Sequence, residues 1–228
     1  MSSWLGRDYK LIVNNIPISE YNAMLQKDYS VSGAEISSSY ADNGRSLVLL
    51  GQKIGLKTLT VKLTFFGKTS DEAYTRYSMF CASLLGVLEL IMPDEKRYRC
   101  ILTSVGAETY VTEGVMDATF SFVGYKHGTL QTVLGSRLFC ESTLPKTDCI
   151  LTVTVGTSGE NYKLGTVTFP SVTAGEVLKV DGITKRILVN GVPAAQKAEW
   201  LQFPYLVPGI NNIDCKDPVT TEYYPAYF

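Results

Sequence analysis

Apolar and polar residues alternate along much of this 228-residue chain. In the stretch TLTVKLTFF, the apolar positions are Leu59, Val61, Leu63 and Phe65, and the polar positions between them are Thr60, Lys62 and Thr64. The same period of two recurs in VMDATFSFVGY, with Met116, Ala118, Phe120 and Phe122, and in ILTVTVG, with Leu151, Val153 and Val155. Alternation that is rich in threonine and β-branched residues is typical of antiparallel strands with one buried face.

Turn dipeptides separate these runs: Asn43-Gly44, Asp181-Gly182, Asn190-Gly191 and Pro208-Gly209. The stretch EVLKVDGITKRILVNGVP predicts two strands joined at DGIT, followed by a second tight turn at NG. Antiparallel strands with short turns predict a mostly β protein built as sandwiches or barrels, and not a parallel α/β fold.

One segment, residues 69–85, has helical spacing instead. Its apolar stripe consists of Ala73, Tyr77, Phe80 and Leu84, widened by Tyr74, Cys81 and Leu85. Thr69 and Glu72 are spaced as a capping box, and Gly86 fits the end of the helix. This segment is the single substantial helix that we expect.

Two further predictions concern the organisation of the chain. The stretch GVLELIMPDEKRYRC reads as a β-hairpin that turns at PDEK. Alternation is lost after residue 128 and then resumes, which places a domain boundary near residue 134. We therefore expect an N-terminal β domain with one helix at 1–134 and an all-β domain at 135–228.

Composition excludes several classes of function. The 21 basic and 22 acidic residues are dispersed and give a net charge of −1, so we expect no contact with nucleic acid or with a membrane surface. The most apolar window, residues 81–92, is shorter than a bilayer span. The first residues lack the basic start and apolar core of a secretory signal, so we expect synthesis in a cytoplasm.

Candidate catalytic groups are sparse, and we expect no enzyme activity, no metal and no cofactor. His127 is the only histidine, so a Ser-His-Asp or Cys-His arrangement would have to include it, and a structural or solvent-exposed role is the simpler interpretation. The five cysteines form no CxxC pair and read as small buried residues. The carboxylates available for a glycosidase pair are Asp94, Glu95, Glu108 and Glu113, and turn positions favour solvated roles for them.

The C-terminal region carries a more specific pattern. DGITKRILVNGVPAA, WLQFPYLVPGINNIDC and VTTEYYPAYF follow one another, and together they resemble the end of the distal tail proteins of long-tailed bacteriophages. The matching positions are Phe203, Pro204, Leu206, Pro208, Gly209, Asn211, Ile213, Tyr224, Pro225, Tyr227 and Phe228. The motif covers about the last 50 residues, and the expected architecture is compatible with the whole chain.

The resemblance implies a fold and a structural role. In that family, an N-terminal β-sandwich with a helix and a hairpin precedes a galectin-like β-sandwich. Its members form hexameric rings that join the end of the tail tube to the tail tip or baseplate. The implied partners are further copies of the chain, the tail tube protein, a tail tip or tail-associated protein, and a receptor-binding protein. The implied location is the tail tip of a virion whose proteins are made in the bacterial cytoplasm.

A hairpin of the first domain is the natural candidate for contact between subunits. The predicted hairpin at 86–100 is our first choice, and its candidate contact residues are Leu90, Ile91, Met92, Lys96, Arg97 and Tyr98. The alternative is that this hairpin packs wholly on its own sandwich. An isolated two-stranded hairpin is only marginally stable in water, so packing against an adjacent subunit would stabilise it.

Two other functions stay open. One is a carbohydrate-binding module, because Trp200, Tyr205, Tyr223, Tyr224 and Tyr227 give the C-terminal region an aromatic character. The other is a β-rich tail tube or connector protein, which would lack a separate galectin-like domain.

Overall fold

The computed structural model describes residues 10–27, 29–42, 44 and 46–228. It divides into two compact units, residues 1–126 and 127–228, and each is described by itself. Residues 1–9, where a secretory signal would begin, and Asn43 of the predicted Asn43-Gly44 turn lie outside the described residues.

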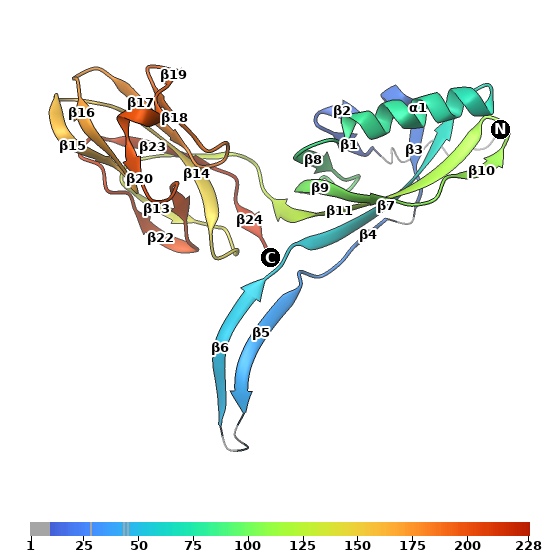
Figure 1. The fold of residues 1–228 in the computed structure, drawn as a ribbon, viewed down its shortest axis with the longest axis horizontal. Coiled ribbons are helices and arrows are strands. Elements are labelled where there is room, and N and C mark those ends of the chain that lie inside the picture. The colour runs from blue at the N-terminus through green and yellow to red at the C-terminus, as the bar shows by residue number, and fades with distance from the viewer. Residues whose placement is uncertain (1–9, 28, 43, 45) are drawn as a thin grey trace. The chain divides into compact units, whose positions relative to one another are not determined.

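The first unit is built around one antiparallel sheet with strand order β2-β1-β8-β9-β11-β7-β3, to which β4 and β10 add short pairings (Figure 1). Its elements are β1 (Ile12–Val13), β2 (Ile16–Pro17), a 3-10 turn (Ile18–Tyr21), β3 (Ala23–Leu25), β4 (Ser30–Val31), β5 (Ile36–Asp42), β6 (Leu47–Ile54), β7 (Lys57–Phe66), α1 (Ser70–Ser83), β8 (Leu88–Ile91), β9 (Arg97–Val105), β10 (Thr109–Thr112) and β11 (Val115–His127). Strands β5 and β6 pair with each other and form a separate two-stranded sheet.

The alternating stretches form the centre of this sheet. Strand β7 pairs with β11 from Phe66↔Val115 to Lys57↔Gly124, so the two predicted apolar faces coincide. All eight predicted inward residues are buried: Leu59, Val61, Leu63, Phe65, Met116, Ala118, Phe120 and Phe122. Thr64 is also buried, contrary to its expected solvent position, because Gln26 and Asp117 cover its hydroxyl with hydrogen bonds of 2.8 and 2.7 Å.

The predicted helix is α1, and it packs on the sheet through Ala73, Tyr77, Phe80 and Leu84. Phe80 makes edge-on ring contacts with Tyr21 and Phe120 at 5.2 Å, a geometry that aromatic pairs favour. The expected widening of the stripe is wrong for Tyr74 and Leu85, which are 45% and 80% exposed. The sheet covers only the narrower stripe, and the helix ends before Leu85.

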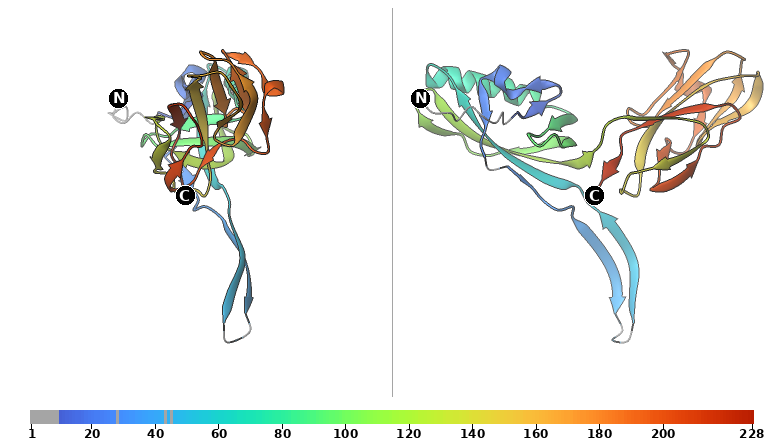
Figure 2. Two further views of the ribbon diagram at one scale, coloured as in Figure 1. Left: turned by 90° about the vertical axis from the view of Figure 1, so that its left-hand side faces the viewer. Right: turned by 180° about the vertical axis from the view of Figure 1, so that it is seen from behind.

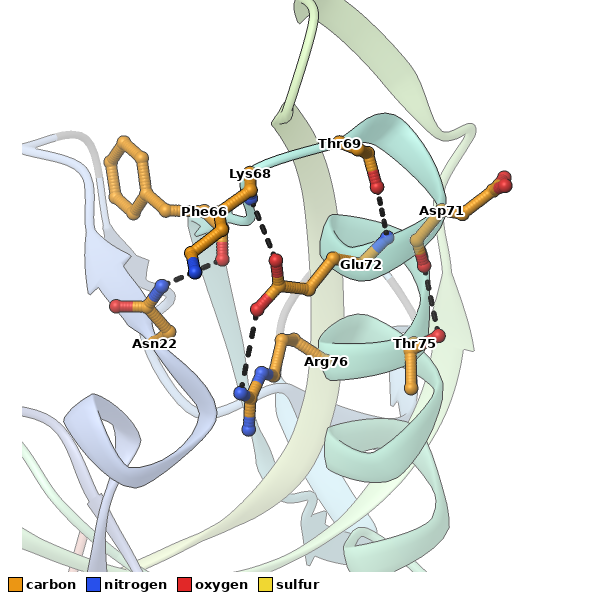
Figure 3. A network of polar contacts seen from close by, with 8 residues as sticks. All are labelled: Asn22, Phe66, Lys68, Thr69, Asp71, Glu72, Thr75 and Arg76. Atoms are coloured by element: carbon orange, nitrogen blue, oxygen red, sulfur yellow. Dashed lines mark hydrogen bonds and ion pairs between the residues drawn. The ribbon is translucent and has the colours of Figure 1, made fainter.

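The start of α1 is capped, although in a different way from a reciprocal capping box (Figure 3). The Thr69 hydroxyl accepts a hydrogen bond from the Glu72 amide at 3.2 Å. The Glu72 carboxylate accepts one from the amide of Lys68 at 2.8 Å, one residue before the cap. Both contacts satisfy backbone donors that have no partner inside the helix.

The second unit contains all remaining strands. They are β12 (Gln131–Leu134), β13 (Arg137–Cys140), β14 (Thr147–Thr154), β15 (Gly159–Leu164), β16 (Val167–Val172), β17 (Val177–Asp181), β18 (Arg186–Val189), β19 (Val192–Pro193), β20 (Glu199–Trp200), β21 (Tyr205–Leu206), β22 (Gly209–Asn212), β23 (Val219–Tyr223) and β24 (Ala226–Tyr227), with a 3-10 turn at Ala195–Lys197. The main sheet has the order β12-β23-β14-β17-β18-β19, and β21 pairs with β14. Smaller sheets, β15-β16-β20 and β13-β22, accompany it.

Inward residues of these sheets meet in one apolar core. From the predicted alternation, Leu151, Val153 and Val155 are buried there, together with Leu164, Phe169, Val180 and Leu206 from other strands. The hairpin predicted at DGIT is formed by β17 and β18. The NG turn that follows has positive φ at both Asn190 and Gly191, as a tight hairpin turn requires.

The mostly β fold class with sandwich-like sheets is therefore confirmed, and α1 is the one α-helix among the described residues. The units divide between Lys126 and His127, whereas the sequence places a boundary near residue 134. The difference arises because β12 pairs along its whole length with β23, which assigns residues 131–134 to the second unit.

Candidate assembly surface

The most exposed apolar element of the first unit is the hairpin of β5 and β6, residues 36–54, which we call the arm. Both views of Figure 2 show it leaving the sheet of its unit as a separate ribbon. Every described residue of β5 is exposed, and so is every residue of β6 except Ile54. The arm is attached through β4 and β7 and through a hydrogen bond from the Gly55 amide to the Glu35 carbonyl at 2.7 Å.

The two strands of the arm differ in composition. Strand β5 is rich in serine, while β6 begins with the four consecutive apolar residues Leu47, Val48, Leu49 and Leu50, which are 72%, 51%, 59% and 68% exposed. Successive residues of a strand point to opposite faces, so both faces of β6 are apolar. The pair Tyr40↔Leu49 adds an exposed aromatic ring, and a β-bulge separates this pair from the pair Ser39↔Gly51.

Such a surface is unusual for an isolated chain. A two-stranded hairpin is marginally stable in water without a third strand or a packed face, and contiguous exposed apolar surface marks a site of interaction. The sequence did not predict the arm, because neither the serine run nor the apolar run alternates. The available signal was the apolar run after Asn43-Gly44.

The hairpin chosen from the sequence for subunit contact is formed by β8 and β9, which pair from Leu88↔Cys100 to Ile91↔Arg97. Three of its candidate contact residues, Leu90, Met92 and Tyr98, are buried in the core of their own unit. They are therefore not available to a neighbouring subunit, because the sheet and helix of the same chain already cover them. Of the other three, Lys96 is exposed, and Ile91 and Arg97 are half-buried.

The charged side chains of this hairpin bond to each other near its tip. Lys96 Nζ lies 2.6 Å from Asp94 Oδ2, and Arg97 donates to Glu89 at 3.0 Å. Burial raises the pKa of Asp94, but the hydrogen bonds and the charge of Lys96 lower it, and the pKa lies below its ordinary value. Contact of these tip residues with another subunit stays a prediction.

The C-terminal motif lies at the junction of β21 and β22 in the second unit. Leu206 and Pro204 are buried, and Phe203 is half-buried against the core. Pro208 is exposed, and Gly209 has a φ of +91°, a left-handed conformation that glycine adopts without strain. The segment is a turn anchored on both sides by the core.

Asn211 closes this turn. Its Oδ1 accepts a hydrogen bond from the Val207 amide at 2.9 Å, and its Nδ2 donates to the carbonyls of Val207 at 2.7 Å and Gly209 at 3.0 Å. Short polar side chains commonly satisfy nearby backbone in this way, and the sequence position of Asn211 predicts such a role.

The last motif residues also have structural positions within the second unit. Pro225 is buried, and its carbonyl accepts a hydrogen bond from the Gly128 amide at 2.8 Å. Tyr224 is half-buried and makes an edge-on ring contact with His127 at 5.4 Å. His127 itself is 6% exposed, and its Nδ1 lies 2.8 Å from the Gly128 carbonyl.

The aromatic residues considered for sugar binding have different environments. Tyr223 is 2% exposed and belongs to the core, where its hydroxyl donates to the Phe139 carbonyl at 3.2 Å. Trp200 is 39% exposed and lies 6.0 Å from the ring of Phe203. Tyr205 lies beneath Lys146 Nζ at 4.4 Å.

Other chemistry is limited in the part of the chain that the structure describes. Within it, no three His, Cys, Asp or Glu side chains gather as a metal site would require, and no helix has the length and apolar character to cross a membrane. Cys100 and Cys149 are buried, which raises the pKa of each thiol to about 12. Thiols with so high a pKa are poor nucleophiles.

Solved structures provide the comparison with known proteins. The Dit protein of phage SPP1, described as a paradigm of the hub adsorption apparatus in phages that infect Gram-positive hosts, matches 96% of this chain and 99% of its own. The TM-score is 0.70 and the identity is 14%. A chain of the phage P2 baseplate in its activated conformation with Ca matches with a TM-score of 0.55 at 10% identity over 92% of both chains, and one in the form with Sr matches with a TM-score of 0.57 at 9% identity over 94% and 97%.

No protein-family model matches the sequence, and no curated protein does either. At these identities the structural matches establish the fold. The resemblance to distal tail proteins that the C-terminal motif indicates is thus confirmed at the level of the fold, over both units.

Proposed function

We propose that this chain is a structural protein of a phage tail, a distal tail protein whose ring joins the tail tube to the tail tip or baseplate. The observation that carries the proposal is the match to the SPP1 hub protein, which covers 96% of this chain and 99% of that one. Because almost nothing is left over on either side, the similarity includes both units and their order. The motif from Phe203 to Pro225 supports the same family independently of the fold.

The arm supports self-assembly as the means of forming the ring. Its apolar residues, Leu47 to Leu50, are exposed in the single chain, and a neighbouring subunit would remove them from water. A contact between two different surfaces of identical chains is heterologous, and it closes into a ring when the rotation between subunits permits. We propose a homo-hexamer on the model of the family.

The other roles that the family implies follow as part of this proposal. The ring would contact the tail tube protein on one side and a tail tip or tail-associated protein on the other, with a receptor-binding protein as a further partner. The location would be the tip of the virion tail, and the second unit would be a galectin-like sandwich. Neither enzyme activity nor a cofactor is part of the proposed role.

The two alternatives have less support. A tail tube protein would lack a separate second domain, whereas residues 127–228 form a compact unit with its own core. For the carbohydrate-binding module, Tyr223 is removed from consideration by its burial. A glycan array probed with the whole chain would detect such binding.

Native mass spectrometry of the purified whole chain over a range of concentrations tests the proposal. A species of six times the mass of one chain is the expected result. A single-chain mass at every concentration would contradict the ring.

A further inference from the structure

Besides the arm, whose two strands pair only with each other, the first unit has another open sheet edge, the outer side of β9 and β10. Strand β8 pairs with β9 only as far as Cys100. Beyond that point, β9 continues from Ile101 to Val105 and β10 runs from Thr109 to Thr112, and both pair with β11 on their inner side alone. Among the described residues no strand covers their outer side. We call residues 101–105 and 109–112 the β9–β10 edge.

The composition of this edge is typical of a strand that pairs with another strand on its outer side. Glu108 is the only charged residue between Ile101 and Thr112, although soluble proteins usually protect exposed edges with lysine or proline. Ile101, Val105, Tyr110 and Val111 are 44%, 36%, 51% and 60% exposed. A β-bulge between Tyr110 and Thr112 leaves Val111 as the extra residue, and bulges of this kind redirect a side chain.

The arm and the far end of this edge lie at opposite ends of the sheet of one chain. Strand β10 pairs with residues 115–117 of β11, which in turn pair with residues 64–66 at the end of β7. The arm joins β7 at its beginning, Lys57. At about 3.3 Å per residue, the ten residues of β7 separate the two features.

We propose that the β9–β10 edge accepts the arm of a second copy of this chain by strand addition, an inference that rests on the proposed self-assembly. An extended segment that adds to an open sheet edge gains main-chain hydrogen bonds for its otherwise unpaired groups. One contact then covers the open edge of β9 and β10 and one outer edge of the arm. Because donor and acceptor are different surfaces, each copy accepts one arm and donates another, as ring closure requires.

The similar length of the two elements and the lack of charge in the apolar run of the arm and along the edge favour a second copy of the chain as the occupant. Strand β6 has eight residues and β5 has seven, and β9 with β10 offers an acceptor of similar length. The arm brings an uncharged apolar run, Leu47 to Leu50, and every residue of the β9–β10 edge is uncharged. Neither element carries a charge pattern that would repel the other.

Two double variants separate the donor from the acceptor. The arm variant carries Leu47→Lys and Leu49→Lys, and the edge variant carries Ile101→Lys and Val111→Lys. All four positions are at least 44% exposed, so the fold of the single chain should be retained. Leu85→Lys with Val87→Lys is the matched control, because these residues are 80% and 59% exposed in the same unit and belong to neither element. Circular dichroism and thermal unfolding verify that each variant is folded.

Native mass spectrometry of the variants, alone and mixed, then tests the pairing. The control should form the same oligomer as the wild type, and the arm and edge variants should each be monomers. Their equimolar mixture should give a heterodimer and nothing larger, because the intact arm of one meets the intact edge of the other while the two remaining surfaces are disabled. If the wild type assembles but the edge variant does too, or the mixture stays monomeric, the edge is not the acceptor, although the ring stands. If the wild type itself is monomeric, the ring and this inference both fail.

Discussion

Asn211 holds both backbone groups of Val207, accepting from its amide at 2.9 Å and donating to its carbonyl at 2.7 Å. The pair encloses the Pro208-Gly209 turn between β21 and β22. Leu206, which precedes Val207 and is the last residue of β21, is fully buried in the core of the second unit. The side chain of Asn211 therefore fixes the direction in which the chain leaves that core.

The first prediction follows from these bonds. Asn211→Ala removes three hydrogen bonds from a half-exposed turn, and should lower the free energy of unfolding of the second unit by about 1–2 kcal/mol. Urea unfolding followed by fluorescence measures the change. Asn212→Ala, an exposed neighbour on the same strand, is the control and should shift stability by no more than about 0.5 kcal/mol. Equal effects of the two substitutions would contradict the role given to Asn211.

Gly209 gives a second prediction, which concerns backbone conformation alone. A Cβ atom at Gly209 would meet no other atom within 4 Å, but its φ of +91° is one that β-branched residues avoid. Gly209→Val should therefore destabilise the second unit by about 1–3 kcal/mol. Gly159→Val is the matched control, because that site is equally open and has no positive φ. A Gly159→Val variant as unstable as Gly209→Val would show that strain at the turn is not the cause.

The cap of α1 predicts a dependence on pH. The hydrogen bond from the Lys68 amide, with a smaller effect of Arg76, holds the pKa of Glu72 below its ordinary value of 4.5. A lowered folded-state pKa adds stability above the unfolded pKa, and this contribution is lost as the pH falls through the folded value. Unfolding measured between about pH 6 and pH 3 should thus show a steeper loss for the wild type than for Glu72→Gln. Parallel curves would mean that Glu72 does not stabilise the folded state through its charge.

The arm predicts a separation between stability and assembly. Leu49→Lys changes a side chain that is 59% exposed in the single chain, so the free energy of unfolding of the monomer should stay within about 0.5 kcal/mol of the wild type. Association should nevertheless weaken, because the contact would bury an unpaired charge. Urea unfolding and sedimentation velocity measure the two effects. A large loss of monomer stability would indicate that the arm packs on its own chain.

Much of the fold could be predicted from local patterns, for physical reasons visible at particular residues. The alternation that ends at Phe65 predicts a strand because one face is buried along its whole length. Thr69 and Glu72 predict the start of α1 because a helix leaves its first amides without partners. The turn at Asn190-Gly191 requires positive φ, which that dipeptide tolerates. Each of these signals depends on nearby residues only.

The assembly surface was harder to predict, because it depends on what the rest of the chain leaves uncovered. The run from Leu47 to Leu50 is as apolar as a core strand, and nothing local distinguishes burial within one chain from burial against another. The same ambiguity led to the choice of Leu90, Met92 and Tyr98 as contact residues of the β8–β9 hairpin. Leu90 and Tyr98 are apolar in sequence, but their own sheet and helix already cover them. Tertiary packing decides both cases.

Negative-stain electron microscopy of the purified whole chain is the most direct test of ring assembly through the arm. We expect closed rings with six-fold symmetry at concentrations where native mass spectrometry detects the hexamer. The arm variant, Leu47→Lys with Leu49→Lys, should give single particles under the same conditions, while Leu85→Lys with Val87→Lys should give rings. Wild-type protein seen only as single particles, or arm-variant protein that still forms rings, would contradict assembly through the arm.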